Sequence, residues 1–271
     1  MPPLSSAQKA AVANFVAITG ATERTASKYL KSSAYKLNEA VDAYFQGGTG
    51  SSTAAANNKE TQLNKAFDGL RNDKEDAKDT LGADSAMGYL QTIGVNMEDV
   101  SLLVAMELVQ APSMGEIQRS GFVTGWKDAG VDANTASQAS HFKSLVSSMS
   151  RDRDLFRKVY RYTFVVGKES AQRALSLETA IVFWDMLFKR PGIVWQGKQA
   201  RVDWLEEYKD FLEENWKRSV SRDMWNQTLE FAFKSMDDDT LTFYSEEGSW
   251  PGVIDEFVVW YKKKNAMEID A

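Results

Sequence analysis

A run of small and polar residues, QGGTGSSTAAANN at positions 46–58, divides the chain into two parts of unequal length. The run has no large apolar side chain, so it cannot bury enough surface to offset the conformational entropy lost on ordering. We therefore expect a flexible tether here, with a separate domain on each side. The sequence predicts a small domain at residues 1–46, a linker at 47–60 and a larger domain at 61–271.

The segment before the tether predicts three short helices. Val12, Phe15 and Val16 fall on one helical face, and Gly20 is a natural helix stop. KLNEAVDAYF, residues 36–45, repeats an apolar stripe on a third helix. The pattern resembles a ubiquitin-associated (UBA) domain, which implies ubiquitin binding, although the same residues could simply close a small core. The resemblance assigns ubiquitin binding to Ile18, Thr19, Gly20 and Phe45.

The larger domain reads as helical almost throughout, without the strand–helix alternation of a parallel sheet. SLLVAMELVQ, residues 101–110, is apolar on every side, which is typical of a buried helix. Residues 73–84 and 111–122 loosely resemble EF-hand loops, but Lys78 occupies the sixth position of the first, where a calcium loop needs glycine. We therefore predict an all-α fold: a small three-helix bundle tethered to a larger helical domain with degenerate EF-hand-like elements that bind no metal.

The residue types exclude most enzyme chemistry. The chain has no cysteine and a single histidine, His141, which we interpret as structural. It contains no glycine-rich phosphate loop and no HExxH motif. Asp223 and Asp255 could be offered as a carboxylate pair for acid–base catalysis, but an all-helical domain is a poor match for a glycosidase. We expect a binding protein with no catalytic residues and no cofactor.

Acidic residues accumulate toward the C-terminus. Residues 1–60 carry six Lys/Arg and four Asp/Glu, whereas residues 61–271 carry 26 and 34. Residues 235–260 hold seven acids and no Lys or Arg. Such a field disfavours nucleic acid and favours a basic protein partner, although a solvated acidic surface would give the same count. Without a long apolar run or a signal pattern, we expect no membrane association and a cytoplasmic and nuclear protein.

Three motifs of the larger domain carry a resemblance to a known family: SLETAIVFWDMLF at 176–188, WKRSVSRDMWNQTLEF at 216–231 and EEGSWPGVIDEFVVW at 246–260. They are similar to the defective-in-cullin-neddylation family, whose fungal and animal members also place a UBA domain before a potentiating-neddylation domain, and the chain is identified as resembling a fungal member. The resemblance covers the chain apart from the tether. It implies a non-catalytic scaffold that holds a cullin and the neddylation conjugating enzyme together, with the RING subunit engaged indirectly, so that the ubiquitin-like modifier is transferred to the cullin.

The family binds the C-terminal winged-helix region of cullins through an Asp–Ala–Asp pattern. The matching positions are Asp223, Ser249 and Asp255, so a serine stands where the family has alanine. Glu246 and Glu247, with Asp237, Asp238 and Asp239, are expected to add long-range attraction toward a basic surface. Trp225, Trp250 and Pro251 are interpreted as packing that holds the two acidic turns together.

The family also has an apolar pocket for the acetylated N-terminal methionine of the conjugating enzyme. The residues that the resemblance assigns to it are Leu102, Ala105, Met106, Val109, Ile117, Val166, Phe183 and Met186. Ordinary core packing is the alternative reading of these positions. Residues 188–204 form a longer, more basic connection than is usual in the family, with no assigned function. A different function also stays open: a ubiquitin-binding adaptor whose helical domain docks another basic protein cargo.

Overall fold

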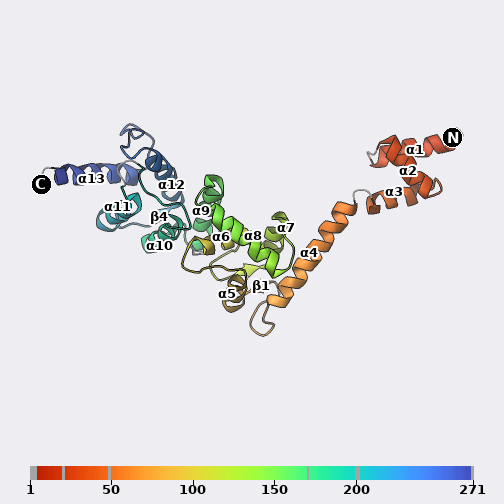
Figure 1. Ribbon diagram of the computed structural model, residues 1–271, viewed down its shortest axis with the longest axis horizontal. Helices are drawn as coiled ribbons and strands as arrows, with labels where there is room; N and C mark the ends of the chain where they lie inside the picture. Colours follow the sequence, from red (N-terminus) through yellow and green to blue (C-terminus); the bar gives the residue numbers. More distant parts are fainter. Residues whose placement is uncertain (1–4, 20–21, 48–49, 170, 199–201, 270–271) are drawn as a thin grey trace. The chain divides into compact units, whose positions relative to one another are not determined.

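In the computed structural model the chain forms two compact units, Met1–Gln62 and Leu63–Ala271 (Figure 1). The structure describes residues 5–19, 22–47, 50–169, 171–198 and 202–269. The prediction of an all-α protein is confirmed, because helices dominate both units and the strands are two residues long. Among the described residues no helix has the length and apolar character needed to cross a membrane.

The first unit contains the three predicted helices, α1 (Ser6–Thr19), α2 (Glu23–Ser32) and α3 (Leu37–Gly47). The hydroxyl of Thr22 caps α2 by accepting from the backbone N–H of Thr25. Phe15 is fully buried and its ring contacts Tyr29 and Tyr44, so one aromatic cluster joins all three helices. This is a small core of its own, as a UBA-like bundle requires.

From Gly50 onward the segment expected to be a flexible tether is helical, since α4 runs from Gly50 to Leu70. The absence of large apolar side chains does not exclude a helix. Residues 54–56 are three consecutive alanines, and alanine has the highest helix propensity. Leu63 and Phe67, at the other end of α4, are fully buried in the core of the second unit. The expected flexibility and the boundaries at 46/47 and 60/61 stay predictions.

The first half of the second unit is built around a short antiparallel strand pair. The elements are β1 (Thr80–Leu81), α5 (Ala83–Thr92), α6 (Val100–Leu108), β2 (Ile117–Gln118), α7 (Arg119–Asp128) and α8 (Thr135–Ser148). β1 and β2 pair with Leu81 opposite Ile117. This pairing joins the two segments that resemble EF-hand loops. Arg119 bonds Asp68 and Asp79 there, both at 2.6 Å, so a guanidinium pairs with these carboxylates.

The second half repeats a helix–strand arrangement. It consists of α9 (Arg153–Gly167), β3 (Ala174–Leu175), α10 (Leu177–Leu187), α11 (Trp204–Phe211), the π-helical turn η1 (Leu212–Trp216), β4 (Val220–Ser221), α12 (Arg222–Asp237) and α13 (Gly252–Ile269). β3 pairs antiparallel with β4, which places the start of α12 next to the start of α10. The family motifs at 176–188 and 216–231 therefore meet through this strand pair.

Aromatic side chains fill the core between α9, α10 and α12. The Tyr160 hydroxyl donates to the Trp225 carbonyl and accepts from the Trp184 indole, each at 2.8 Å. The Trp225 indole in turn donates to the Tyr160 carbonyl at 2.9 Å. All three side chains are fully buried, and their rings stack. A fully satisfied buried polar network of this kind fixes the relative positions of the three helices.

Candidate functional site

Asp223 lies in the first turn of α12 and is exposed. The hydroxyl of Ser221 caps the helix by accepting from the Met224 backbone N–H at 3.1 Å. A carboxylate is favoured at this end of a helix, because the unpaired N–H groups give it partial positive charge. Trp225, two residues later, belongs to the buried aromatic network, so Asp223 projects from a rigid support.

Trp250 connects the turn that holds Ser249 to α12. Its half-buried ring packs edge-on against Phe231 of α12 and Phe243, with ring centres 5.9 and 6.1 Å apart. The Pro251 carbonyl accepts from backbone N–H groups at the start of α13. Ser249 itself is exposed immediately before this corner. This packing fits the structural role that the sequence suggested for Trp250 and Pro251.

Asp255, in the first turn of α13, is half-buried and held by a neighbour. Tyr244 donates its hydroxyl to Asp255 Oδ1 at 2.9 Å. Burial and the adjacent carboxylates of Asp255 and Glu246 raise the pKa of Tyr244 to about 12, so its hydroxyl stays protonated at neutral pH. The phenol hydroxyl that donates to Asp255 Oδ1 therefore fixes the orientation of this carboxylate.

Asp255 borders a surface groove of about 420 Å³, here named the acidic groove. The residues that line it are Phe211, Asn215, Tyr244, Glu246, Asp255, Glu256, Val259 and Trp260. Carboxylates stand beside aromatic rings, and Val259 is 56% exposed. Such a surface can bind a partner that offers cationic side chains next to an apolar one. The described lining residues do not include Asp223 or Ser249.

The sequence did not predict the apolar side of the acidic groove, formed by Phe211, Val259 and Trp260. In the sequence these residues fit the apolar faces of amphipathic helices. The available signal was the run VVW at 258–260, because three consecutive apolar residues on a helix cannot all face one core. Glu246 lines the groove, and Glu247, the next residue, is exposed; their role in cullin binding stays a prediction.

The three aspartates at 237–239, expected to add long-range attraction toward a basic surface, also have structural roles within the chain. Asp237 pairs with Arg153 at 2.8 Å and Lys198 at 2.9 Å, and their hydrogen bonds hold the pKa of Asp237 well below its usual range. Asp239 is buried. A charge count could not reveal this, because the neutralising cations are distant in sequence.

Asp238 caps its own turn. Its carboxylate accepts from the hydroxyls of Thr240 and Thr242, with further bonds from their backbone N–H groups at 3.1 and 2.9 Å. These bonds lower the pKa of Asp238 to about 2, so the turn keeps its negative charge over the physiological pH range. Asp238 thus shapes the loop that leads to Tyr244.

The connection at 188–204 braces the end of α12. Trp195 is fully buried, and its indole donates to the Ser235 hydroxyl at 2.9 Å. Lys198 of the same connection forms the ion pair with Asp237. The basic character noted in the sequence therefore has a structural role where the connection is described.

The eight residues assigned to the conjugating-enzyme pocket are mostly interior. Ala105, Met106, Val109 and Ile117 have no exposed surface, while Val166 and Phe183 are 2% and 7% exposed. Leu102 and Met186 are half-buried and pack against the same core. Leu102 and Met186 are therefore the two members of this cluster with the most exposed surface.

The predicted ubiquitin-binding residues are described only in part. Ile18 is 56% exposed at the end of α1, and the Thr19 hydroxyl donates to the Phe15 carbonyl at 2.7 Å. Gly20 and the side chain of Phe45 lie outside the described residues. An exposed isoleucine at a helix end is a suitable contact for a protein partner.

His141 contacts the buried Trp126, whose ring centre lies 6.2 Å away. In the part of the chain that the structure describes, no three His, Cys, Asp or Glu side chains come together as metal ligands would.

Comparisons with known proteins define both units. A sequence model of UBA-like domains matches residues 9–51, and a model described as Cullin binding matches residues 137–260. The second match contains Asp223, Ser249, Asp255 and the acidic groove. The fold and the site thus define a protein that combines a UBA-like domain with a cullin-binding domain.

Curated relatives identify the family within this class of protein. "Defective in cullin neddylation protein 1" of Pyricularia oryzae is 41% identical over 99% of this chain and 100% of the relative. The protein of that name in Yarrowia lipolytica is 31% identical over 90% of this chain and 93% of the relative. "DCN1-like protein 4" of Homo sapiens is 28% identical over 69% of this chain and 59% of its own length. The chain belongs to the defective-in-cullin-neddylation family, as the sequence motifs predicted.

Proposed function

We propose that the protein is a scaffold for cullin neddylation that binds a cullin and the neddylation conjugating enzyme and promotes transfer of the ubiquitin-like modifier to the cullin. The observation that carries the proposal is the acidic groove with its Tyr244-held Asp255, inside the segment matched by the cullin-binding family. The scaffold contributes proximity and orientation, which can supply a large part of a rate enhancement without any catalytic residue of its own.

The cullin partner is proposed to be the basic surface of its C-terminal winged-helix region. Asp223 and Asp255 would receive cationic side chains, since each lies in the first turn of a supported helix. Ser249, exposed between the acidic turns, adds one hydroxyl where the family pattern has alanine. Glu246 and Glu247 would accelerate encounter through an effect that salt weakens.

The conjugating enzyme is proposed to bind through its acetylated N-terminus at the apolar cluster of α6, α9 and α10, entering beside Leu102 and Met186. Acetylation removes the charge of the terminal amine, so inserting that end among apolar side chains avoids a large desolvation cost. The RING subunit would be engaged indirectly, through the cullin. We propose that this occurs in the cytoplasm and the nucleus.

Ubiquitin is the proposed partner of the UBA-like domain, with Ile18 as the exposed apolar contact. The alternative of a ubiquitin adaptor that docks another basic cargo is less favoured, because the cullin-binding match lies in the larger unit. Deleting residues 1–58 separates the two functions. Stimulation of cullin modification should largely survive that deletion.

Reconstituted neddylation of a cullin, with and without this protein, tests the proposal directly. The rate of modifier transfer should rise in its presence and fall to the unstimulated rate with the double variant Asp223→Lys/Asp255→Lys. A matched double variant, Asp84→Lys/Asp128→Lys, changes the same charge on other helices of the unit and should keep the stimulation. Equal rates with and without the wild-type protein would refute the scaffold function.

The contact with the conjugating enzyme has its own test. An acetylated N-terminal peptide of that enzyme should bind more tightly than its unacetylated form, and Met186→Lys should remove the difference. Equal affinities of the two peptides would refute the proposed site.

A further inference from the structure

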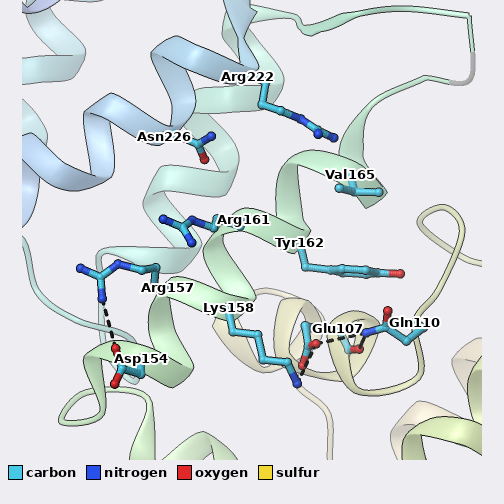
Figure 2. A pocket seen from close by; sticks show the side chains of 10 residues that line it. All are labelled: Glu107, Gln110, Asp154, Arg157, Lys158, Arg161, Tyr162, Val165, Arg222 and Asn226. Carbon is cyan, nitrogen blue, oxygen red and sulfur yellow. Dashed lines mark hydrogen bonds and ion pairs between the residues drawn. The ribbon is translucent and has the colours of Figure 1, made fainter. Parts of the chain in front are cut away.

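A second surface groove, of about 570 Å³, lies between α9, the start of α12 and the end of α6 (Figure 2). It is here named the basic groove. The residues that line it are Glu107, Gln110, Asp154, Arg157, Lys158, Arg161, Tyr162, Val165, Arg222 and Asn226. It shares no lining residue with the acidic groove. Its volume falls within the range of about 300–1,000 Å³ that is usual for ligand sites.

The basic groove has more cationic than anionic side chains, although the unit to which it belongs is acidic overall. Residues 61–271 hold 26 Lys/Arg against 34 Asp/Glu, yet the groove is lined by four cations and two anions. Both anions are already paired, Glu107 with Lys158 at 3.0 Å and Asp154 with Arg157 at 3.2 Å. Glu107 lies beneath Lys158 with only 6% of its side chain exposed, so its charge is largely covered.

Two further cations are available to a ligand. Arg161 is 58% exposed and reaches a carboxylate, that of Glu230, only at 4.0 Å, while Arg157 shares the same Glu230 at 3.4 Å. Arg222 stacks its guanidinium over the Phe164 ring at 5.6 Å, and within the described residues no carboxylate lies within ion-pair distance of it. Figure 2 shows Arg222 extending from the start of α12 toward Val165 on α9.

The groove also offers an apolar contact. Val165 is 40% exposed on the same face of α9 as Arg161. Tyr162 is fixed beside it, because its hydroxyl donates to the Ala111 carbonyl at 2.8 Å. Burial and the nearby Glu107 raise the pKa of Tyr162 to about 12, so this donor is retained at neutral pH. Guanidinium groups around an exposed valine suit a chain with carboxylates on either side of an apolar residue.

We infer that the basic groove is a docking site for a short acidic peptide segment of a partner protein, whose carboxylates pair with Arg161 and Arg222 and whose apolar side chain packs on Val165. A protein segment fits better than nucleic acid. A polyphosphate chain would meet the repulsion of the surrounding negative field, whereas a few carboxylates match the few free cations. Arg222 adjoins Asp223 in the sequence, so the basic groove lies next to one of the two aspartates proposed to bind the cullin.

Fluorescence anisotropy with the full chain tests the inference. The probe is a fluorescein-labelled peptide, Glu-Asp-Glu-Leu-Asp-Glu-Leu-Glu, and its matched control carries Gln and Asn in place of Glu and Asp. The acidic probe should bind saturably and the neutral one at least about tenfold more weakly, because most of the recognition is ionic. Equal binding of the two probes would overturn the inference.

Variants locate the binding. Arg161→Glu/Arg222→Glu should weaken the acidic probe by about tenfold or more, while Arg161→Lys/Arg222→Lys should keep most of the affinity. The matched pair Lys143→Glu/Arg173→Glu changes the same charge at exposed positions outside the groove and should have less than a twofold effect. If the reversal pair fails to fold by circular dichroism, Arg161→Gln/Arg222→Gln gives the same test with a smaller change.

Two other occupants would overturn the inference. Tighter binding of a single-stranded oligothymidylate than of the acidic probe would identify a nucleic-acid site. Self-association that blocks the probe and disappears in Arg161→Gln/Arg222→Gln would identify a second copy of the chain as the occupant. Loss of probe binding in the control pair alone would place the contact elsewhere.

Discussion

The Tyr160 hydroxyl is the polar centre of the core that supports the start of α12. It donates to the Trp225 carbonyl and accepts from the Trp184 indole, each at 2.8 Å, with full burial of all three side chains. Replacing Tyr160 by phenylalanine keeps the ring and its stacking but removes one oxygen atom. The Trp184 N–H then has no partner in a site that water does not reach, and the Trp225 carbonyl loses one of its bonds.

The expected loss of stability follows from these two bonds. A buried donor or acceptor left unsatisfied costs about 1–3 kcal/mol. The unsatisfied Trp184 N–H accounts for the larger part of this cost, because the Trp225 carbonyl still accepts a hydrogen bond within its helix. We therefore expect Tyr160→Phe to lower the free energy of unfolding by about 2–4 kcal/mol, a large fraction of the roughly 5–15 kcal/mol that holds a typical domain together.

Urea unfolding followed by tryptophan fluorescence measures this change in the free energy of unfolding. An unchanged slope of that free energy against urea concentration would show that the variant exposes the same surface on unfolding as the wild type. The control is Tyr162→Phe, whose hydroxyl donates to the Ala111 carbonyl at 2.8 Å at a half-buried position. Water can replace that bond, so the control should cost less than about 1 kcal/mol. Equal costs for the two variants would refute the reasoning about the buried network.

Three further predictions concern packing and pH. Gly125→Ala places a Cβ 1.9 Å from the Leu108 carbonyl oxygen and should lower the free energy of unfolding by about 3 kcal/mol. Gly69→Ala, with no atom within 4 Å of the new Cβ, should leave stability unchanged or raise it. Thermal unfolding compares the two variants, and equal shifts of the melting temperature would contradict the close approach of α6 and α7. Burial raises the pKa of Tyr244 and other tyrosines, so above about pH 10 the unfolded chain releases their protons first and stability should fall; a melting temperature constant from pH 9 to 11.5 would contradict this. The lowered pKa of Asp237 contributes stability that is fully present above about pH 4, the ordinary range of an aspartate. Asp237→Asn should therefore cost less than about 1 kcal/mol at pH 7, since the pair is half-exposed, and urea unfolding should show this difference from wild type shrinking progressively as the pH falls from 4 toward the lowered folded-state pKa; a difference that does not change with pH would contradict this.

Sequence reasoning succeeded where a pattern has one structural solution. The all-round apolar run at 101–110 could only be a buried helix, and α6 is buried on nearly every side. The motif that contains Trp225 and the motif that contains Trp250 predicted a family, and the full-length relatives confirm it. The residue roles within those motifs stay predictions that mutagenesis must test.

Sequence reasoning failed where the outcome depends on residues distant along the chain. Asp237 was expected to add long-range attraction toward a partner, and the sequence did not show that Arg153 and Lys198 pair with it from two other segments. The basic groove escaped notice because Arg161 and Arg222 belong to different helices of an acidic unit. Helix α4 was missed for another reason, since its alanines satisfy helix propensity without any apolar pattern.

The central claim is that Asp223 and Asp255 form the cullin-docking face. Isothermal titration calorimetry of a cullin C-terminal winged-helix region against the wild-type chain and Asp223→Lys/Asp255→Lys tests it most directly. Reversing charges that pair with a partner costs at least about 2 kcal/mol, so the affinity should fall by about 30-fold or more while circular dichroism stays unchanged. Wild-type affinity in the folded double variant would contradict the account.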